Sequence, residues 1–204
     1  MSTLDCFLAA TTLTVTAVLT FRLRRAEQLT AQCHRRRLAT RHIADTDALT
    51  GLGNRRALHA SAVTGPDHTA LILINLDGHR GFVNRFGDRA FDQLFALVAG
   101  RVHALASTGA VFRLRRDELA VLIAATTADA EAAAVDLLAA VAEAHELDLG
   151  GNQVTVTVTG CAGVAAVRSL GDYPLMLPDI ALRRAKALGR GRVAVFTAYR
   201  GDPR

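Results

Sequence analysis

The feature of this sequence that most constrains its fold is a regular alternation of strand-like and helix-like segments from residue 70 onward. Short apolar runs, one of them alternating Val and Thr, are typical of strands, and longer segments with apolar residues at helical spacing are typical of helices. The expected strands are Ala70–Leu76, Val111–Leu114, Leu119–Ala124, Val154–Val158 and Arg192–Phe196, and the expected helices are Asp88–Leu105, Ala128–Leu147 and Pro178–Leu188. This order predicts an α+β fold in which helices pack on a sheet.

The composition suits one domain with an appendage. Half of the 204 residues are hydrophobic but only 5% are aromatic, so the core must be built from many small aliphatic contacts. The cysteines Cys6, Cys33 and Cys161 lie far apart and lack the spacing of metal ligands. They predict neither a disulfide framework nor a zinc site.

The first part of the chain has the pattern of a membrane anchor. From Leu4 to Phe21 the residues are mainly apolar, and Asp5 is the only charge among them. The length is close to the roughly 20 residues that a helix needs to cross a bilayer. Arginines follow directly, and such cationic flanks stay in the cytoplasm. We therefore expect residues 1–21 to form a single transmembrane helix, the alternative being a buried helix, because five threonines dilute the apolar run.

A basic segment follows the apolar run. Residues 22–44 contain no Gly or Pro and are rich in Arg, Ala, Gln and Leu, which predicts a helical linker. Much of the net charge of +5 lies here. A basic block beside an apolar segment more often marks the flank of a membrane span than a surface for DNA, so no specific nucleic acid is expected as a partner.

The segment Asp47–Arg56 reads Asp-Ala-Leu-Thr-Gly-Leu-Gly-Asn-Arg-Arg. It resembles the opening motif of GGDEF domains, the family of diguanylate cyclases, at every fixed position. Further blocks resemble the family in its own order, namely Ile72–Asp77, Arg113–Leu122, Val154–Val164 and Ala181–Arg190. The resemblance spans residues 45–197 and leaves 198–204 as a tail. It implies the ferredoxin-like, antiparallel sheet of nucleotidyl cyclases with packed helices.

The resemblance also implies a chemistry. The family joins two GTP molecules into cyclic di-GMP, each held by one domain of an antiparallel pair, and phosphoryl transfer needs divalent cations held by carboxylates. The expected partners are therefore a guanine nucleotide with Mg²⁺, and a second copy of the chain or another signalling protein. The family's metal-binding Asp aligns with Asn75, a neutral amide. Asp77, two residues on, and Asp117 remain as candidate metal ligands.

The signature hairpin departs from the family pattern. It reads Arg115-Arg116-Asp117-Glu118-Leu119 where the family has Gly-Gly-Asp/Glu-Glu-Phe. Asp117 and Glu118 keep the acidic positions and are the candidate catalytic pair. Arg115 and Arg116 replace two glycines, and their side chains would either pair with these carboxylates, bind phosphate or lie in solvent.

The candidate nucleotide-binding residues are only partly retained. The family's base-contacting Asn aligns with Val83, and the Arg and Asp of its product-inhibition site align with Ala106 and Gly109. Product inhibition at that site is therefore not expected. The residues that match the family's nucleotide contacts are Asp92, Lys186 and Arg190.

Taken together, these features predict a degenerate GGDEF domain anchored in the bacterial inner membrane, with the domain in the cytoplasm. We expect it to serve cyclic di-GMP-type signalling as a nucleotide-binding or protein-interaction module without cyclase activity. One alternative is an active diguanylate cyclase with an altered metal site. The other is a basic protein associated with membranes or nucleic acids.

Overall fold

The computed structural model describes Arg22, Arg24, Arg25 and Glu27, and residues 44–62, 69–106, 109–167 and 175–196. The chain divides into two compact units, Met1–Ala44 and Asp45–Arg204. The predicted anchor at 1–21, most of the linker at 22–44 and the tail at 198–204 lie outside the described residues. Among the residues that are described, no helix is long and apolar enough to cross a membrane.

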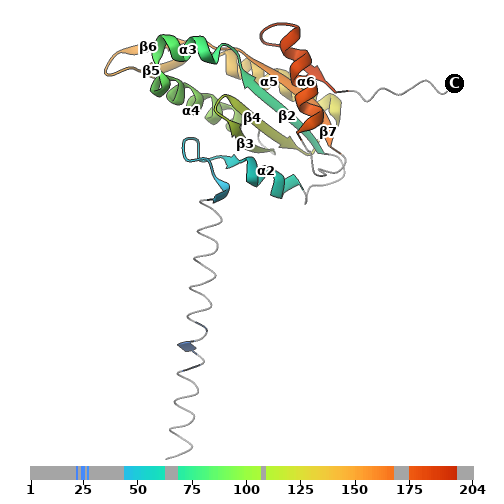
Figure 1. The fold of residues 1–204 in the computed structure, drawn as a ribbon. Helices are drawn as coiled ribbons and strands as arrows, with labels where there is room; N and C mark the ends of the chain where they lie inside the picture. The colour runs from blue at the N-terminus through green and yellow to red at the C-terminus, as the bar shows by residue number, and fades with distance from the viewer. Residues whose placement is uncertain are drawn as a thin grey trace, which may run out of the picture. The chain divides into compact units, whose positions relative to one another are not determined.

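The second unit is built on a mixed sheet. Its described residues form six strands in the order β1-β3-β4-β2-β7-β8 (Figure 1). The strands are β1 (Gly53–Asn54), β2 (Thr69–Leu76), β3 (Ala110–Arg115), β4 (Glu118–Ile123), β7 (Gly160–Val167) and β8 (Val193–Val195). The inner four are antiparallel, whereas β1 and β8 run parallel to their neighbours. The antiparallel sheet that we predicted is therefore present in the inner four strands, but the sheet as a whole is mixed because both edge strands are parallel to their neighbours.

Helices cover both faces of this sheet. They are α2 (Arg55–Ala62), α3 (His79–Phe86), α4 (Asp88–Leu105), α5 (Thr127–Ala142) and α6 (Met176–Ala187). One apolar core joins α4 and α5 to the side chains of Ile72 and Ile74, and a second joins α2 and α6 to Leu71 and Leu73. Because alternate residues of a strand point to opposite faces, both faces of β2 are buried, and its sequence from Ala70 to Ile74 is apolar.

The segment after α5 differs from the prediction. The helix expected to reach Leu147 ends at Ala142, because His145–Asp148 forms strand β5 with alternating buried and exposed side chains. It pairs with β6 (Gln153–Val156) in a separate two-stranded hairpin. Two glycines with positive φ, Gly150 and Gly151, make the turn between them. The predicted strand Val154–Val158 therefore does not belong to the main sheet, and β7 takes that place.

Helix α6 packs unusually close to β7. A Cβ at Gly163 would lie 2.2 Å from both the Leu182 nitrogen and the Pro178 oxygen of the helix backbone. Only glycine allows this approach, because every other residue carries that atom. The close contact brings the end of α6 beside the end of β2.

Candidate functional site

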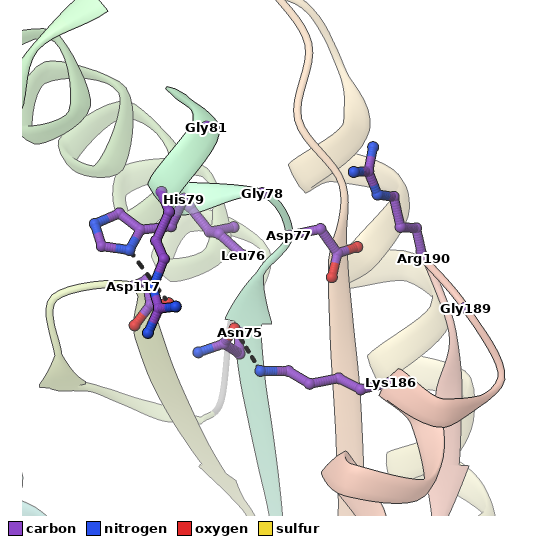
Figure 2. A pocket seen from close by; sticks show the side chains of 11 residues that line it. Asn75, Leu76, Asp77, Gly78, His79, Gly81, Asp117, Lys186, Gly189 and Arg190 are labelled. Carbon is purple, nitrogen blue, oxygen red and sulfur yellow. Dashed lines mark hydrogen bonds and ion pairs between the residues drawn. The ribbon is translucent and has the colours of Figure 1, made fainter. Parts of the chain in front are cut away.

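A pocket of about 430 Å³ lies where β2 ends. Its walls come from four segments: the end of β2 from Asn75 to Asp77, the start of α3 from Gly78 to Gly81, Asp117 of the signature hairpin, and the last turn of α6 with the loop that follows it. Figure 2 shows these side chains around the pocket. The structure thus brings together parts of three of the blocks on which the sequence resemblance rests.

Asn75 is buried, with 7% of its surface exposed, and lies opposite Glu118 on β4. Lys186 Nζ donates a hydrogen bond to Asn75 Oδ1 over 2.8 Å (Figure 2). The residue that replaces the family's metal ligand is therefore directly joined to a residue predicted to bind phosphate. The two could not be paired from sequence, because 111 positions separate them.

Asp77, the predicted substitute metal ligand, is occupied by hydrogen bonds from the protein. Its Oδ2 accepts from Thr159 Oγ1 over 2.8 Å and from the Gly191 backbone N–H over 3.2 Å. Its Oδ1 lies 3.4 Å from Cys161 Sγ, and the single proton of that thiol is also within reach of the Gly189 carbonyl oxygen, at 3.2 Å. Burial, and also the nearby Asp77 carboxylate, raise the pKa of the Cys161 thiol, so the thiol keeps the proton that it donates. We call these contacts the Asp77 clasp.

Asp117 and Glu118 face different surroundings. Asp117 lines the pocket, and its Oδ2 lies 3.9 Å from Nδ1 of His79, which packs against the ring of Phe91. Glu118 begins β4, and burial raises the pKa of its carboxyl group above the usual range. The candidate acidic pair is thus divided, with only Asp117 on the pocket wall.

The two arginines of the signature do not bind the adjacent carboxylates. Arg116 forms an ion pair with Asp88 at the start of α4, and its guanidinium lies 5.7 Å from the centre of the Phe91 ring. Arg115 is exposed on the edge of the hairpin. The sequence left three arrangements open for these two arginines. Arg115 lies in solvent, which is one of the three, whereas Arg116 takes none of them and pairs with Asp88 of α4.

A neighbouring arginine fixes the hairpin to the opening motif. Arg113 Nη1 donates to both carboxylate oxygens of Asp47, at 3.1 and 3.3 Å, and its other nitrogens donate to the carbonyls of Arg115 and Arg116. The guanidinium also lies 4.6 Å from the ring centre of Phe95. Burial tends to raise the pKa of Asp47, but hydrogen bonds from Arg113 and Thr50 outweigh it and leave the pKa lowered.

The predicted nucleotide contacts are not all at the pocket. Lys186 and Arg190 line it, whereas Asp92 lies in the second turn of α4 and does not. Sequence reasoning missed His79 and Arg80, which also line the pocket. The signal available for them in the sequence was Gly78, a turn-forming residue directly after the apolar run. In the structure it has a positive φ of 73° and precedes α3.

The donors present do not fit Mg²⁺ as they are arranged. The oxygen of Asn75 already accepts from an ammonium group, and Oδ2 of Asp77 already accepts two hydrogen bonds. In the part of the chain that the structure describes, no three His, Cys, Asp or Glu side chains gather as a metal site would require. Mg²⁺ prefers carboxylate oxygens in near-octahedral geometry, and Asp117 alone offers one here.

The product-inhibition positions are closed by packing. Ala106 is buried at the end of α4, and a Cβ at Gly109 would lie 2.5 Å from the Ile123 side chain. A longer polar side chain at residue 109 would therefore displace Ile123.

Known proteins resemble this chain in sequence and fold. The family described as "Diguanylate cyclase, GGDEF domain" matches residues 44–192. The chain is 34% identical over 167 residues to the uncharacterized protein Rv1354c of Mycobacterium tuberculosis, covering 78% of this chain and 26% of that one. It is 29% identical over 160 residues to the diguanylate cyclase DgcP of Pseudomonas aeruginosa, covering 74% and 24%. The chain thus spans about a quarter of the length of these relatives.

One solved structure illustrates the likeness of fold. The coiled coil and GGDEF domain of DgcB from Caulobacter crescentus, determined in complex with c-di-GMP, superposes with a TM-score of 0.72 at 23% identity. The match covers 87% of this chain and 98% of that one. At this identity the likeness concerns the fold, which is the α+β fold predicted from the sequence.

Proposed function

Given that this chain belongs to the diguanylate cyclase GGDEF domain family, we propose that it is a module of cyclic di-GMP-type signalling that does not itself form cyclic di-GMP. Its role is to bind a guanine nucleotide, a second copy of the chain or another signalling protein. The observation that carries the proposal is the hydrogen bond between Lys186 Nζ and Asn75 Oδ1. An ammonium group sits where cyclase chemistry requires a carboxylate and a divalent metal.

Two further arrangements support the proposal. The Asp77 clasp makes that carboxylate a poorer metal ligand, since its Oδ2 already accepts two hydrogen bonds and its Oδ1 lies beside the Cys161 thiol. Arg116, which stands in place of a family glycine, crosses to Asp88 on α4. The pocket itself persists, with Lys186 and Arg190 on its wall, so the losses concern turnover more than the ability to hold an anion.

The test is a turnover assay on the full chain in detergent micelles. The protein is incubated with GTP and either Mg²⁺ or Mn²⁺, and the products are separated by chromatography. We expect no cyclic di-GMP above the amount formed by heat-denatured protein. Formation of cyclic di-GMP that disappears in an Asp117→Ala variant would overturn the proposal.

The second candidate is an active diguanylate cyclase with an altered metal site. It is favoured by Asp117, which lines the same pocket as Lys186 and Arg190. Such an enzyme would hold its metal mainly through Asp117, with Glu118 beside it. The assay above separates the two candidates, because only the active enzyme loses a measurable rate when Asp117 is replaced.

We also propose that residues 1–21 anchor the chain in the bacterial inner membrane, with Asp45–Arg204 in the cytoplasm. The uncharged run after Asp5 and the arginines that follow it support this placement. Cells expressing the full chain and a chain that starts at residue 45 are fractionated, and the membranes are washed with alkaline carbonate. Release of the full chain by the wash would contradict the anchor.

A further inference from the structure

We propose that the pocket at the end of β2 binds the polyphosphate group of a nucleotide directly, without a divalent cation. This inference rests on the proposed function and deepens it, because it names both the ligand chemistry and the absence of a metal requirement. The misfit between the donors present and Mg²⁺ is its starting point. Four features of the pocket carry it further.

The first feature is the orientation of the Asn75 amide. A lysine ammonium can only donate hydrogen bonds, so the atom that Lys186 contacts must be the amide oxygen. The amide nitrogen Nδ2 is thereby turned to the other side of the group (Figure 2). No described residue accepts a hydrogen bond from this nitrogen, although Asn75 is 7% exposed and lines the pocket. This nitrogen is not shut off from solvent, so it is free to donate to an acceptor that enters the pocket, such as a phosphate oxygen.

This amide reverses the role of the position. A carboxylate at residue 75 would present only acceptors to the pocket and would repel phosphate unless a metal ion lay between them. The amide presents a donor and no charge. The substitution of Asn for Asp therefore removes the need for the cation as well as the means of holding it.

The second feature is the start of α3. Residues 79–81 line the pocket, and their backbone N–H groups belong to the first turn of the helix, where no intrahelical acceptor exists. No side chain caps this turn. Added Cβ atoms at Gly78 and Gly81 would meet no atom within 4 Å, so the backbone is open on that side. Such N–H groups are well suited to bind phosphate oxygens.

The third feature is the balance of charge. Arg80, Lys186 and Arg190 line the pocket, against the carboxylates of Asp77 and Asp117. Three cationic side chains thus face two carboxylates, and this excess of positive charge favours an anion in the pocket.

The fourth feature is size. The pocket volume of about 430 Å³ lies within the range of small-molecule sites. Inorganic tripolyphosphate is a suitable probe because it carries the phosphate chemistry without a base or a sugar. Because Asp92 and Val83 do not line the pocket, the polyphosphate group is expected to supply most of the affinity. GTP, ATP and tripolyphosphate should therefore bind with similar strength.

The test is calorimetric titration of the full chain in detergent micelles with GTP, ATP and tripolyphosphate, in EDTA and in Mg²⁺. We expect binding in EDTA, with a change of less than about threefold in Kd when Mg²⁺ replaces EDTA. Asn75→Asp should weaken binding in EDTA by roughly tenfold or more, because it exchanges a donor for a charge that repels phosphate. Mg²⁺ should recover part of that loss in the variant alone.

Two variants on the same helix provide the matched comparison. Lys186→Ala removes a cation from the pocket wall, whereas Arg184→Ala removes an exposed cation that does not line it. We expect the first to weaken tripolyphosphate binding by roughly tenfold and the second to leave it within about twofold, since remote surface charges are screened by salt. Circular dichroism spectra of both variants check that the fold is intact.

The outcomes separate this inference from the proposed function. Binding of GTP that requires Mg²⁺, without turnover, overturns the inference and leaves the proposed function standing. Equal binding by the parent and Asn75→Asp in EDTA also overturns it. Formation of cyclic di-GMP overturns the proposed function whatever the binding data show.

Discussion

Replacing Gly163 by Ala tests the packing that places α6 beside β2. The new Cβ would lie 2.2 Å from the Leu182 nitrogen and the Pro178 oxygen, and 2.7 Å from Leu182 Cα. Non-bonded carbon contacts are comfortable only at about 3.5 Å, so the helix must retreat by roughly 1 Å. The obstacles are backbone atoms of a helix, which cannot turn aside as a side chain can.

The cost should therefore lie at the upper end of the range for overpacking, about 3 kcal/mol in the free energy of unfolding. For a chain of this size that cost corresponds to a fall in Tm of roughly 6 to 12 °C. The displacement should also lengthen the 2.8 Å hydrogen bond from Lys186 to Asn75, and so weaken tripolyphosphate binding in EDTA. Urea denaturation measures the first effect and calorimetric titration the second.

The matched control is Gly100→Ala in α4. An added Cβ there meets no atom within 4 Å, and alanine favours a helix over glycine, so this variant should gain about 0.5–1 kcal/mol in stability. If Gly163→Ala unfolds at the same urea concentration as the parent, the close approach of α6 to β7 has been misjudged, and with it the placement of Lys186.

Three further predictions concern stability. Arg113→Ala should lower the free energy of unfolding by about 2–4 kcal/mol in urea denaturation, because the 11%-exposed side chain pairs with Asp47 and lies over Phe95. Burial and the Arg101 guanidinium lower the pKa of His145 in the folded protein. Stability that is present above about pH 6.5 should therefore be lost as the pH falls through the folded pKa. His145→Leu should abolish this loss in denaturation curves measured across pH. Burial raises the pKa of Glu118, so the contribution of this residue to stability should be present below about pH 4.3 and lost as the pH rises. At neutral pH, Glu118→Gln should therefore unfold at a higher urea concentration than the parent.

The parts of the fold that the sequence predicted well are those where local pattern and tertiary packing agree. Helix α4 has the predicted bounds, Asp88–Leu105, because its apolar residues recur at helical spacing and a single face meets the core. Strand β2 was expected to begin at Ala70 and begins one residue earlier, at Thr69. Its apolar run identified it as a strand because both of its faces are buried.

The parts that failed are those where packing overrode local preference. Gly160–Val167 begins with Gly-Cys-Ala-Gly, which has little preference for a strand, yet it lies inside the sheet between β2 and β8, where its small residues let α6 approach. Val154–Val158 has the stronger strand pattern and was expected in its place. A local pattern could not reveal which of the two the helix would cover.

The sequence predicted which residues form the site better than it predicted the contacts between them. Lys186, Arg190, Asp77 and Asp117 all line one pocket, and the resemblance had singled out each of them. Their roles as ligands stay predictions. The sequence could not predict which residues pair across long separations. Lys186 and Asn75 are 111 residues apart, and no local pattern connects them.

The Asp77 clasp has a consequence for the order in which the molecule assembles. It joins the end of β2 to Thr159 before β7 and to Gly191 near the end of the described chain, across 82 and 114 positions. Closing such long loops is slow relative to forming local helices, so the clasp should be among the last contacts made. During synthesis, the complete pocket can form only after Gly191 has left the ribosome. A chain cut short after α6 would keep Lys186 but lose the Gly191 amide that holds its neighbouring loop in place.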